Sequence, residues 1–293
     1  MKIKESPTRK FFGVINAMLL LALVFVTLYP MLHVLFASFS DGNLLMAHSG
    51  VLLKPIGFNI ESYKKIIDYP MFLRSYFNTL YIVVMTLALN FVLTAFGAYF
   101  LSRKNISGQK VIMIMILLTM YFNGGLIPTY INIRNLNLYN SHLAIILPGA
   151  INTFNLIILK TSFGSVPESL CESAKLDGAS HFRILFSIIL PLAKSSLAVV
   201  ILYYAVAHWN AWFNAMIFLE DRELFPLQLI LREILLMNDT SGMMTGVLES
   251  DVQAVGESLK YAVIIMATVP ILCVYPFLQR YFAKGTMVGA IKE

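Results

Sequence analysis

The charged side chains most able to make specific contacts in this sequence lie in residues 165–191, between two long apolar segments. They are Glu168, Glu172, Lys175, Asp177 and Arg183. The hydrocarbon of a bilayer does not tolerate such a density of charge. The segment must therefore lie in water or against another protein, where its carboxylates are suited to charge-assisted hydrogen bonds with basic partners.

Sequence patterns for hydrolysis are missing. The chain has no G-x4-G-K-[ST] loop to hold a nucleotide phosphate, so it cannot hydrolyse ATP alone. H-E-x-x-H and G-x-S-x-G are missing as well, which removes the machinery of an intramembrane hydrolase. We expect no catalytic residue, no metal site and no cofactor on this chain.

The charged segment has the pattern of two short helices joined by a tight turn. Ser165 and Glu168 have capping-box spacing, which predicts the start of the first helix. Asp177-Gly178 predicts the turn, because glycine supplies the backbone freedom to stop one helix and start the next. An apolar face is then expected on the second helix from Phe182, Leu185, Phe186 and Ile189. We therefore expect a protruding, acidic pair of helices whose second helix packs against the rest of the protein.

The rest of the chain is unusually apolar. Of its 293 residues 58% are hydrophobic and 13% charged, which is typical of a membrane protein that crosses the bilayer several times. Six apolar segments are long enough to span, and we expect them as helices near residues 11–37, 76–101, 111–131, 142–163, 194–219 and 259–282. The expected fold is all-α, one transmembrane domain over residues 1–293. The formal charge of +6 is not taken as a sign of nucleic-acid binding.

The basic residues predict the orientation of these spans. With the N-terminus inside, 13 of the 22 Lys and Arg residues fall in inner segments and 7 in outer ones, with Lys160 and Lys260 at the membrane borders. Cytoplasmic segments of membrane proteins carry the excess of basic residues. We therefore expect both termini and residues 165–191 in the cytoplasm.

Polar residues inside the spans are candidates for lining a pore. They are Asn123, Asn152, Asn155, Tyr203, His208, Asn210, Trp212 and Asn214. Hydrogen bonding between helices is an alternative role for each of them, and Trp212 also fits an aromatic belt. We expect a distorted helix near Asn123 and a kink at Pro148. On a continuous fifth span, Tyr203, Asn210 and Asn214 would share one stripe.

Two outer loops have helical patterns of their own. The first contains a short helical stretch at Glu61 to Asp68. In the loop from Glu220 to Glu257, Pro226 opens a predicted helix whose apolar stripe could lie on the membrane or on neighbouring loops. A polar, flexible tip of Asn238, Asp239, Thr240, Ser241 and Gly242 is expected to follow.

The charged segment also resembles a known motif. Glu172-Ser173-Ala174, then Gly178, then Ile188-x-Leu190-Pro191 match the EAA motif of ABC importer permeases, E-A-A-x3-G-x9-I-x-L-P, with Ser173 as a small-for-small replacement. Residues 121–163, 209–235 and 280–293 look like the maltose-type group of carbohydrate importer permeases. Within that group they are most similar to the permeases for complex oligosaccharides, such as the alginate importer. The similarity covers nearly the whole chain.

The resemblance implies a coupling helix that docks in a cleft of a cytoplasmic ATPase. The residues that it assigns to ATPase coupling are Glu168, Glu172, Ser173, Ala174, Asp177, Gly178, Ile188, Leu190 and Pro191. Glu172 would pair with a basic residue of the ATPase, Ala174 would allow close packing and Gly178 would form the turn. The loop tip at residues 238–242 would contact an extracellular or periplasmic solute-binding protein.

The resemblance also implies a multi-pass protein of the inner or plasma membrane of a bacterial cell, with protein partners and a sugar substrate. They are a second permease subunit in a heterodimer, two ATPase subunits that hold ATP and Mg²⁺, and the solute-binding protein. A permease of this class for another solute is an alternative. An ion-coupled secondary transporter is another, but it should carry an acidic residue within the membrane, and none of the proposed spans contains Asp or Glu.

Overall fold

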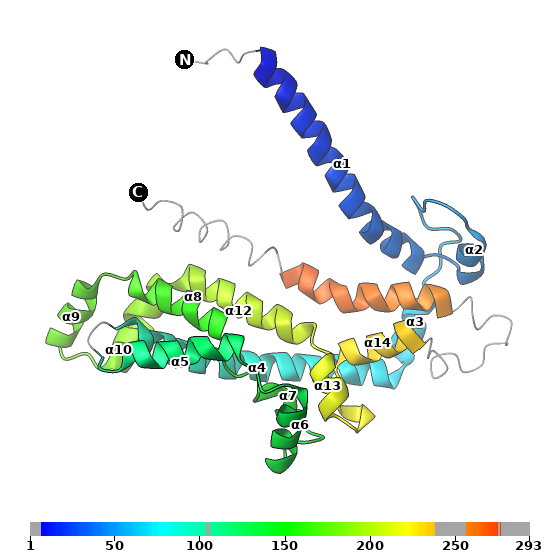
Figure 1. Cartoon of the computed structure of the whole chain (residues 1–293). Coiled ribbons are helices and arrows are strands. Elements are labelled where there is room, and N and C mark those ends of the chain that lie inside the picture. Colours follow the sequence, from blue (N-terminus) through cyan, green and yellow to red (C-terminus); the bar gives the residue numbers. More distant parts are fainter. Residues whose placement is uncertain (1–6, 104–105, 238–255, 275, 277–293) are drawn as a thin grey trace. The chain divides into compact units, whose positions relative to one another are not determined.

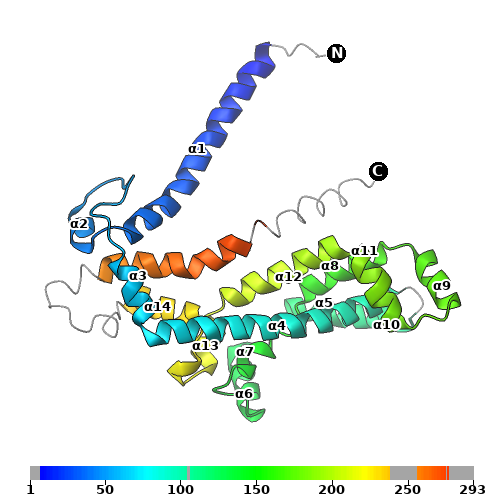
Figure 2. The same ribbon diagram turned by 180° about the vertical axis from the view of Figure 1, so that it is seen from behind.

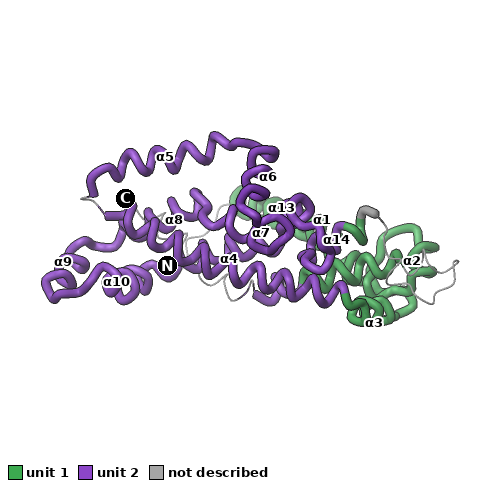
Figure 3. The backbone as a smooth tube through the Cα atoms, turned by 90° about the horizontal axis from the view of Figure 1, so that it is seen from below, with its two compact units in different colours: residues 1–70, 233–268 green, residues 71–232, 269–293 purple. Residues whose placement is uncertain are grey.

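The computed structural model of the chain describes residues 7–103, 106–237, 256–274 and 276. Within these residues every regular element is a helix and none is a strand, as expected (Figure 1). The contacts divide the chain into two compact units (Figure 3). Unit 1 comprises residues 1–70 and 233–268, and unit 2 comprises residues 71–232 and 269–293. We describe each unit separately.

Unit 1 is formed by the N-terminal helix and the first outer loop, with much of the last described helix. Its elements are α1 (Pro7–Ser38), α2 (Gly42–Ala47), α3 (Glu61–Asp68) and the greater part of the helix Gly256–Val274. The predicted helix at residues 61–68 is confirmed. The apolar window of α1 is 0% buried, so this helix is free to lie against lipid or another subunit.

Polar contacts fix the first outer loop inside unit 1. The Leu52 amide donates to the hydroxyl of Tyr29 on α1 at 3.0 Å. The hydroxyls of Ser62 on α3 and Ser258 on the last described helix lie 2.9 Å apart, and both residues are buried. The loop is therefore attached to two long helices rather than hanging free.

Unit 2 holds the remaining helices. They are α4 (Pro70–Ser102), α5 (Gln109–Tyr121), α6 (Leu126–Asn135), α7 (Leu143–Ile146), α8 (Thr153–Gly164), α9 (Glu168–Leu176), α10 (His181–Ile184), a π-helix (Leu185–Ile189), α11 (Leu190–Leu192), α12 (Lys194–Trp209), α13 (Phe213–Phe218), a 3-10 turn (Arg222–Leu224) and α14 (Leu227–Met237). The first residue of α4 and the last five residues of α14 belong to unit 1. Figures 1 and 2 both show α8 beside α12, and α5 also packs on α8.

The main core of unit 2 lies where its longest helices meet the charged segment. Buried side chains come from α4, α8, α9, the helices after it and α12. They include Ala98, Phe163, Cys171, Ile184 and Val200. Burying each large apolar side chain contributes about 1.5–3 kcal/mol. The charged segment is thus packed onto the membrane-spanning helices.

The expected third span is broken rather than continuous. Helices α5 and α6 meet at an angle of 113°, across residues 122–125. The side-chain oxygen of Asn123 accepts a hydrogen bond from the Gly125 amide at 2.8 Å, and Gly125 has φ 92°. Glycine adopts this left-handed region without a steric cost. The predicted distortion near Asn123 is confirmed, but it is a full bend and not a weakened helix.

The expected fourth and fifth spans, residues 142–163 and 194–219, are also interrupted. Pro148 lacks an amide donor, and α8 begins only at Thr153. On the fifth segment α12 ends at Trp209 and α13 begins at Phe213. There the Asn210 side chain donates to the Val206 carbonyl at 3.0 Å and so competes with continuation of the helix. The prediction of one stripe along a continuous fifth helix is therefore wrong.

The described helices include fewer candidate membrane spans than the six expected from the sequence. Three of them are long and apolar enough to cross a membrane, and up to five candidates result if each bent pair counts as one span. The bent pairs are α5 with α6, and residues 181–192 with α12. The chain is thus an all-helical protein with several candidate spans, and two of these are broken.

Candidate functional site

The turn after α9 has the geometry that the sequence predicts. Gly178 has φ 79°, where residues with a Cβ are strained. Its amide donates to the Lys175 carbonyl at 3.0 Å, and the Ala179 amide donates to the Ala174 carbonyl at 2.9 Å. These bonds close the C-terminus of α9 and allow the chain to reverse. The conformation of this turn depends on the glycine.

The start of α9 differs from the prediction. Ser165 does not cap this helix, because α8 continues to Gly164 and takes Ser165 into its last turn. The Ser165 hydroxyl donates to the Ser162 carbonyl at 2.7 Å. Pro167 precedes Glu168 without any side-chain cap. The predicted capping box is therefore wrong, while the predicted helix is present.

Helix α9 has one face in the core and one face exposed. Cys171 is buried and Ala174 half-buried, whereas Glu172 and Ser173 are exposed. Leu176 is 89% exposed, an unusual position for a leucine beside a charged turn. The sequence analysis overlooked Leu176, although its place on the polar side of a short helix was a usable signal. An acidic and apolar surface on a fixed helix is suited to docking.

The segment after the turn packs by its second half, as expected, but only two of the four residues predicted for the packed face, Leu185 and Ile189, are buried. Ile184, Leu185 and Ile189 are buried, whereas Phe182 and Phe186 are 65% and 50% exposed. The π-helix at residues 185–189 has a wider turn, which changes the facing of Phe186 from that in a regular helix, whereas Phe182 precedes it on α10. The regular helical spacing therefore predicted Phe182 and Phe186 on the buried face with Leu185 and Ile189, whereas Ile184 is buried with them.

The end of the EAA pattern lies at a sharp bend. Within the pattern, Ile188 is half-buried, Leu190 is buried and Pro191 is exposed. The Leu190 amide bonds to the Leu185 carbonyl, five residues back, and Pro191 has no amide to donate. The segment His181–Leu192 meets α12 at 88°. The last residues of the pattern therefore stand immediately before the bend into α12.

Arg103 at the end of α4 holds the same region together. Its guanidinium donates to the Cys171 sulfur at 3.3 Å and to the Phe163 carbonyl at 3.0 Å. It also lies over the Tyr99 ring, 5.2 Å from the centroid. The Tyr99 hydroxyl in turn lies 2.9 Å from Nδ1 of His181. These contacts tie α9 and α10 to α4 and α8. In the sequence Arg103 is only one of the 13 basic residues of the inner segments, and nothing there indicates these contacts.

A cavity of about 540 Å³ brings together four of the eight pore-lining candidates. Its lining residues are Pro148, Gly149, Ile151, Asn152, Phe154, Asn155, Tyr203, Tyr204, Ala207 and His208. The Phe154 and Tyr203 rings have centroids 6.2 Å apart and are both exposed. Aromatic rings beside amides and an imidazole suit a ligand with both apolar and hydroxyl-bearing faces.

Buried hydrogen bonds fix the wall of this cavity. The Asn90 amide nitrogen, in the orientation that satisfies its neighbours, donates to the Ala150 and Thr86 carbonyls, and its oxygen accepts from His208 Nε2 at 3.2 Å. The Tyr204 hydroxyl accepts from the Asn152 amide at 2.9 Å. Asn152 and His208 therefore hold structural hydrogen bonds and also line the cavity, while their role in a pore stays a prediction.

The other four candidates lie elsewhere. Asn123 and Asn210 form the local bonds that interrupt their helices. The Trp212 ring carries the Arg232 guanidinium 4.5 Å from its centroid, a cation–π contact. Asn214 is exposed on α13. None of these four lines the 540 Å³ cavity.

The base of the second outer loop is firmly attached to α4. Arg74 and Glu223 form an ion pair at 2.8 Å, and the Asn78 amide donates to the Glu223 carbonyl at 2.7 Å. Helix α14 follows Pro226 as predicted, but Leu227 and Ile230 are buried in the protein. Its apolar face is therefore not available to lie on a membrane. The candidate tip at residues 238–242 lies outside the described residues.

Among the described residues, no group of three or more His, Cys, Asp or Glu side chains has an arrangement that could hold a metal ion. The exposed carboxylate of Glu172 is suited to contact with a protein partner, and the cavity is suited to passage or binding of a small polar molecule.

Known proteins of similar sequence show the family to which the chain belongs. Residues 107–288 match the family model of the binding-protein-dependent transport system inner membrane component. The chain is 37% identical to the polygalacturonan/rhamnogalacturonan transport system permease protein YtcP of Bacillus subtilis, over 93% of this chain and 95% of the relative. It is 36% identical to Protein LplC of the same organism, over 98% and 97%.

A solved structure is also similar over nearly the whole chain. It is a chain from the crystal structure of a bacterial ABC transporter involved in the import of the acidic polysaccharide alginate. The TM-score is 0.87 and the identity 32%, covering 96% of this chain and 100% of that chain. The family model and these similarities show that the chain belongs to the binding-protein-dependent transport system inner membrane components, the non-catalytic multi-pass permease subunits of ABC importers.

Proposed function

We propose that this permease subunit forms half of a translocation pore for an oligosaccharide and couples it to a cytoplasmic ATPase through α9. The observation that carries the coupling role is the α9 geometry, an exposed Glu172 and Leu176 on a short helix that ends at Gly178. An exposed, acidic and apolar knob beside a buried Cys171 fits docking into a cleft with a basic residue. In this proposal all the residues that the resemblance assigns to ATPase coupling, from Glu168 to Pro191, belong to the coupling segment.

The proposed topology has six spans with both termini in the cytoplasm. The broken segments α5 with α6, α7 with α8, and α12 with α13 then each count as one interrupted span. Broken helices at membrane depth occur where they border protein or a cavity. Support comes from the 540 Å³ cavity at the breaks near residues 148–152, and from the excess of basic residues in the inner segments.

Closure of the ATPases would push α9 toward its counterpart on a second permease subunit. The 88° bend before α12 would pass this movement to the helix that carries Tyr203, Tyr204 and His208. The cavity would then open to the outside and accept the sugar from a solute-binding protein. ATP hydrolysis on the partner subunits would restore the inward-facing state. We propose that residues 238–242 contact the solute-binding protein.

An oligosaccharide fits the cavity chemically. The exposed rings of Phe154 and Tyr203 suit the C–H faces of sugar rings, while Asn152, Asn155 and His208 suit hydroxyl groups. No cavity-lining residue is acidic, and the sequence has no Asp or Glu between Asp68 and Glu168. An anionic sugar would therefore meet no carboxylate there. Similar proteins named for polygalacturonan and for alginate support a fragment of an acidic polysaccharide.

The partners in this proposal are a second, unlike permease subunit, two ATPases and a solute-binding protein. The alternative is a permease of the same class that carries a different solute. One uptake experiment distinguishes the two. Uptake of labelled trigalacturonate into vesicles that hold the intact complex and its loaded solute-binding protein should be blocked by other uronate oligomers. Neutral oligosaccharides of the same length should block it weakly. If neither sugar class is transported while an unrelated solute is, the sugar assignment is wrong, although the permease assignment stands.

A further inference from the structure

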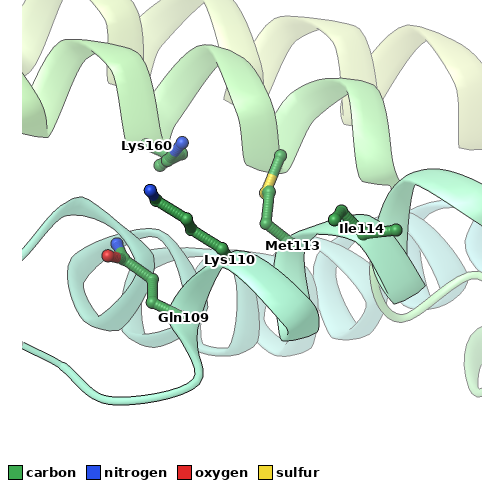
Figure 4. Close-up of a pocket in the computed structure, with 5 residues that line it drawn as sticks. All are labelled: Gln109, Lys110, Met113, Ile114 and Lys160. Carbon is green, nitrogen blue, oxygen red and sulfur yellow. The ribbon is translucent and has the colours of Figure 1, made fainter.

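A second pocket lies in unit 2, between α5 and α8, the helix that leads into α9. It has a volume of about 420 Å³ and is lined by Gln109, Lys110, Met113, Ile114 and Lys160. Figure 4 shows the ends of both lysine side chains reaching the space between α5 and α8. Lys160 lies one turn before the end of α8 and is half-buried, whereas Lys110 is exposed. Two ammonium groups from different helices therefore converge on one pocket.

No acidic group of the described residues neutralises these lysines. Among the described residues the ion pairs join other side chains, and neither Lys110 nor Lys160 has an ionic or hydrogen-bonded partner. The sequence places no Asp or Glu between Asp68 and Glu168. Like charges brought together without a counter-ion repel each other. The pocket is therefore suited to an external anion.

The start of α5 adds further attraction for an anion. This helix begins at Gln109 without a side-chain cap, after Gly108 at φ 78°. The Gln109 side chain donates to the Leu101 carbonyl, which holds the start of α5 against the end of α4. The Gln109 amide already donates to the Ile106 carbonyl at 3.4 Å, so the attraction at this helix start is that of the helix dipole, which favours a negative group. Lys110 lies in this first turn.

The remaining wall indicates what carries the anion. Met113 and Ile114 form its apolar side, and the exposed surface of α5 continues with Val111, Met115 and Leu118. An inorganic anion would make no use of this surface, whereas an acyl chain would lie along it. Basic pockets between membrane helices on the cytoplasmic side are suited to lipid head groups.

We propose that this pocket binds the phosphate head group of an anionic phospholipid, with Lys110 and Lys160 as its two cationic contacts. The placement in the cytoplasmic leaflet rests on the proposed topology, but the pocket and its charge do not. Because α8 leads directly into α9, a lipid bound here would hold α5 against α8 next to the coupling segment.

The test uses the purified, intact transporter complex. One sample is saturated with phosphatidylglycerol and another with phosphatidylcholine. Native mass spectrometry measures retention of phosphatidylglycerol and of phosphatidylcholine by the wild type, Lys110→Gln/Lys160→Gln and the control Lys194→Gln. Lys194 is an exposed lysine of the same end of unit 2 that does not line the pocket. Inorganic phosphate is added as a competitor in a separate arm.

The proposal expects the wild type and Lys194→Gln to retain phosphatidylglycerol in preference to phosphatidylcholine. Losing both pocket lysines should weaken phosphatidylglycerol binding by about thirtyfold, with inorganic phosphate a poor competitor. Unchanged retention in the double variant would overturn the site. Efficient displacement of phosphatidylglycerol by inorganic phosphate would show that the pocket binds a free anion, and would overturn the proposal of a lipid head group.

A loss of the second permease subunit from the double variant, without loss of lipid, would show that a partner carboxylate fills the pocket and would also overturn the proposal. Failure of the proposed ATPase coupling would leave lipid retention unchanged, so the two proposals fail separately.

Discussion

The hydroxyl of Tyr99 on α4 lies 2.9 Å from Nδ1 of His181, the first residue of α10. This hydrogen bond links a long membrane helix directly to the segment that follows the Gly178 turn. Together with Arg103 it makes α4, α8, α9 and α10 one packed body within unit 2. Movement of α9 relative to α4 would have to break these contacts.

Tyr99→Phe removes only the hydroxyl of this link. We expect the complex to assemble and its basal ATPase rate to be retained, while stimulation by loaded solute-binding protein falls several-fold. A single neutral hydrogen bond contributes about 0.5–1.5 kcal/mol, enough to loosen the link without unfolding the helix. Tyr121→Phe is the matched control, because Tyr121 is 81% exposed at the end of α5. Equal stimulation in both variants would show that the Tyr99–His181 contact does not transmit movement.

Substitutions at Gly178 test the turn through its backbone conformation. At φ 79° the space around the glycine is open, so only the backbone opposes a side chain. A residue with a Cβ in this region costs about 1–2 kcal/mol, and asparagine tolerates it better than alanine. Stimulated ATPase activity should therefore decrease in the order glycine, asparagine, alanine, proline, with membrane insertion unchanged. Equal activity of the asparagine and proline variants would contradict a role for this conformation.

Cysteine labelling tests the orientation of the chain. After replacement of Cys171 and Cys273, a cysteine at Asn238 should react with an impermeant thiol reagent from outside the cell. A cysteine at Ser107 should react only after the membrane is opened, because its segment carries the basic residues expected inside. The reverse labelling pattern would place Glu172 outside the cell, away from the ATPase, and would contradict the proposed coupling role.

Shortening the second outer loop tests the proposed receptor contact. Replacing residues 238–243 by two glycines should leave assembly and basal ATPase activity intact, because the loop base is attached separately through Arg74, Asn78 and Glu223. Stimulation by loaded solute-binding protein should fall. A loop that only covers the helices below it would give unchanged stimulation and uptake in the shortened variant.

The all-helical fold and the coupling segment follow from local patterns in the sequence. Helix α9, the Gly178 turn and α3 each depend on residues close in the chain, such as Asp177 before Gly178. The breaks in the third, fourth and fifth spans were harder to predict. Apolar composition favours a continuous helix there, while single side chains such as Asn210 divert the backbone.

Contacts between distant residues could not be read from spacing. Arg103 is 68 residues from Cys171, and only the packed fold brings them together. The cavity likewise depends on α8 and α12 meeting. The π-helix at residues 185–189 changed the buried face because its wider turn has no distinct apolar period in the sequence.

The central claim is that Glu172 on α9 couples this permease to an ATPase, and Glu172→Ala tests it most directly. The measurement is ATPase activity of the reconstituted complex with and without loaded solute-binding protein. Glu61→Ala in α3 of unit 1 serves as the control for loss of an exposed carboxylate. Truncating a hydrogen-bonded interfacial charge costs about 2–5 kcal/mol of contact. The account predicts normal insertion with stimulation abolished or sharply reduced in Glu172→Ala alone, and near-normal stimulation and uptake in that variant would contradict it.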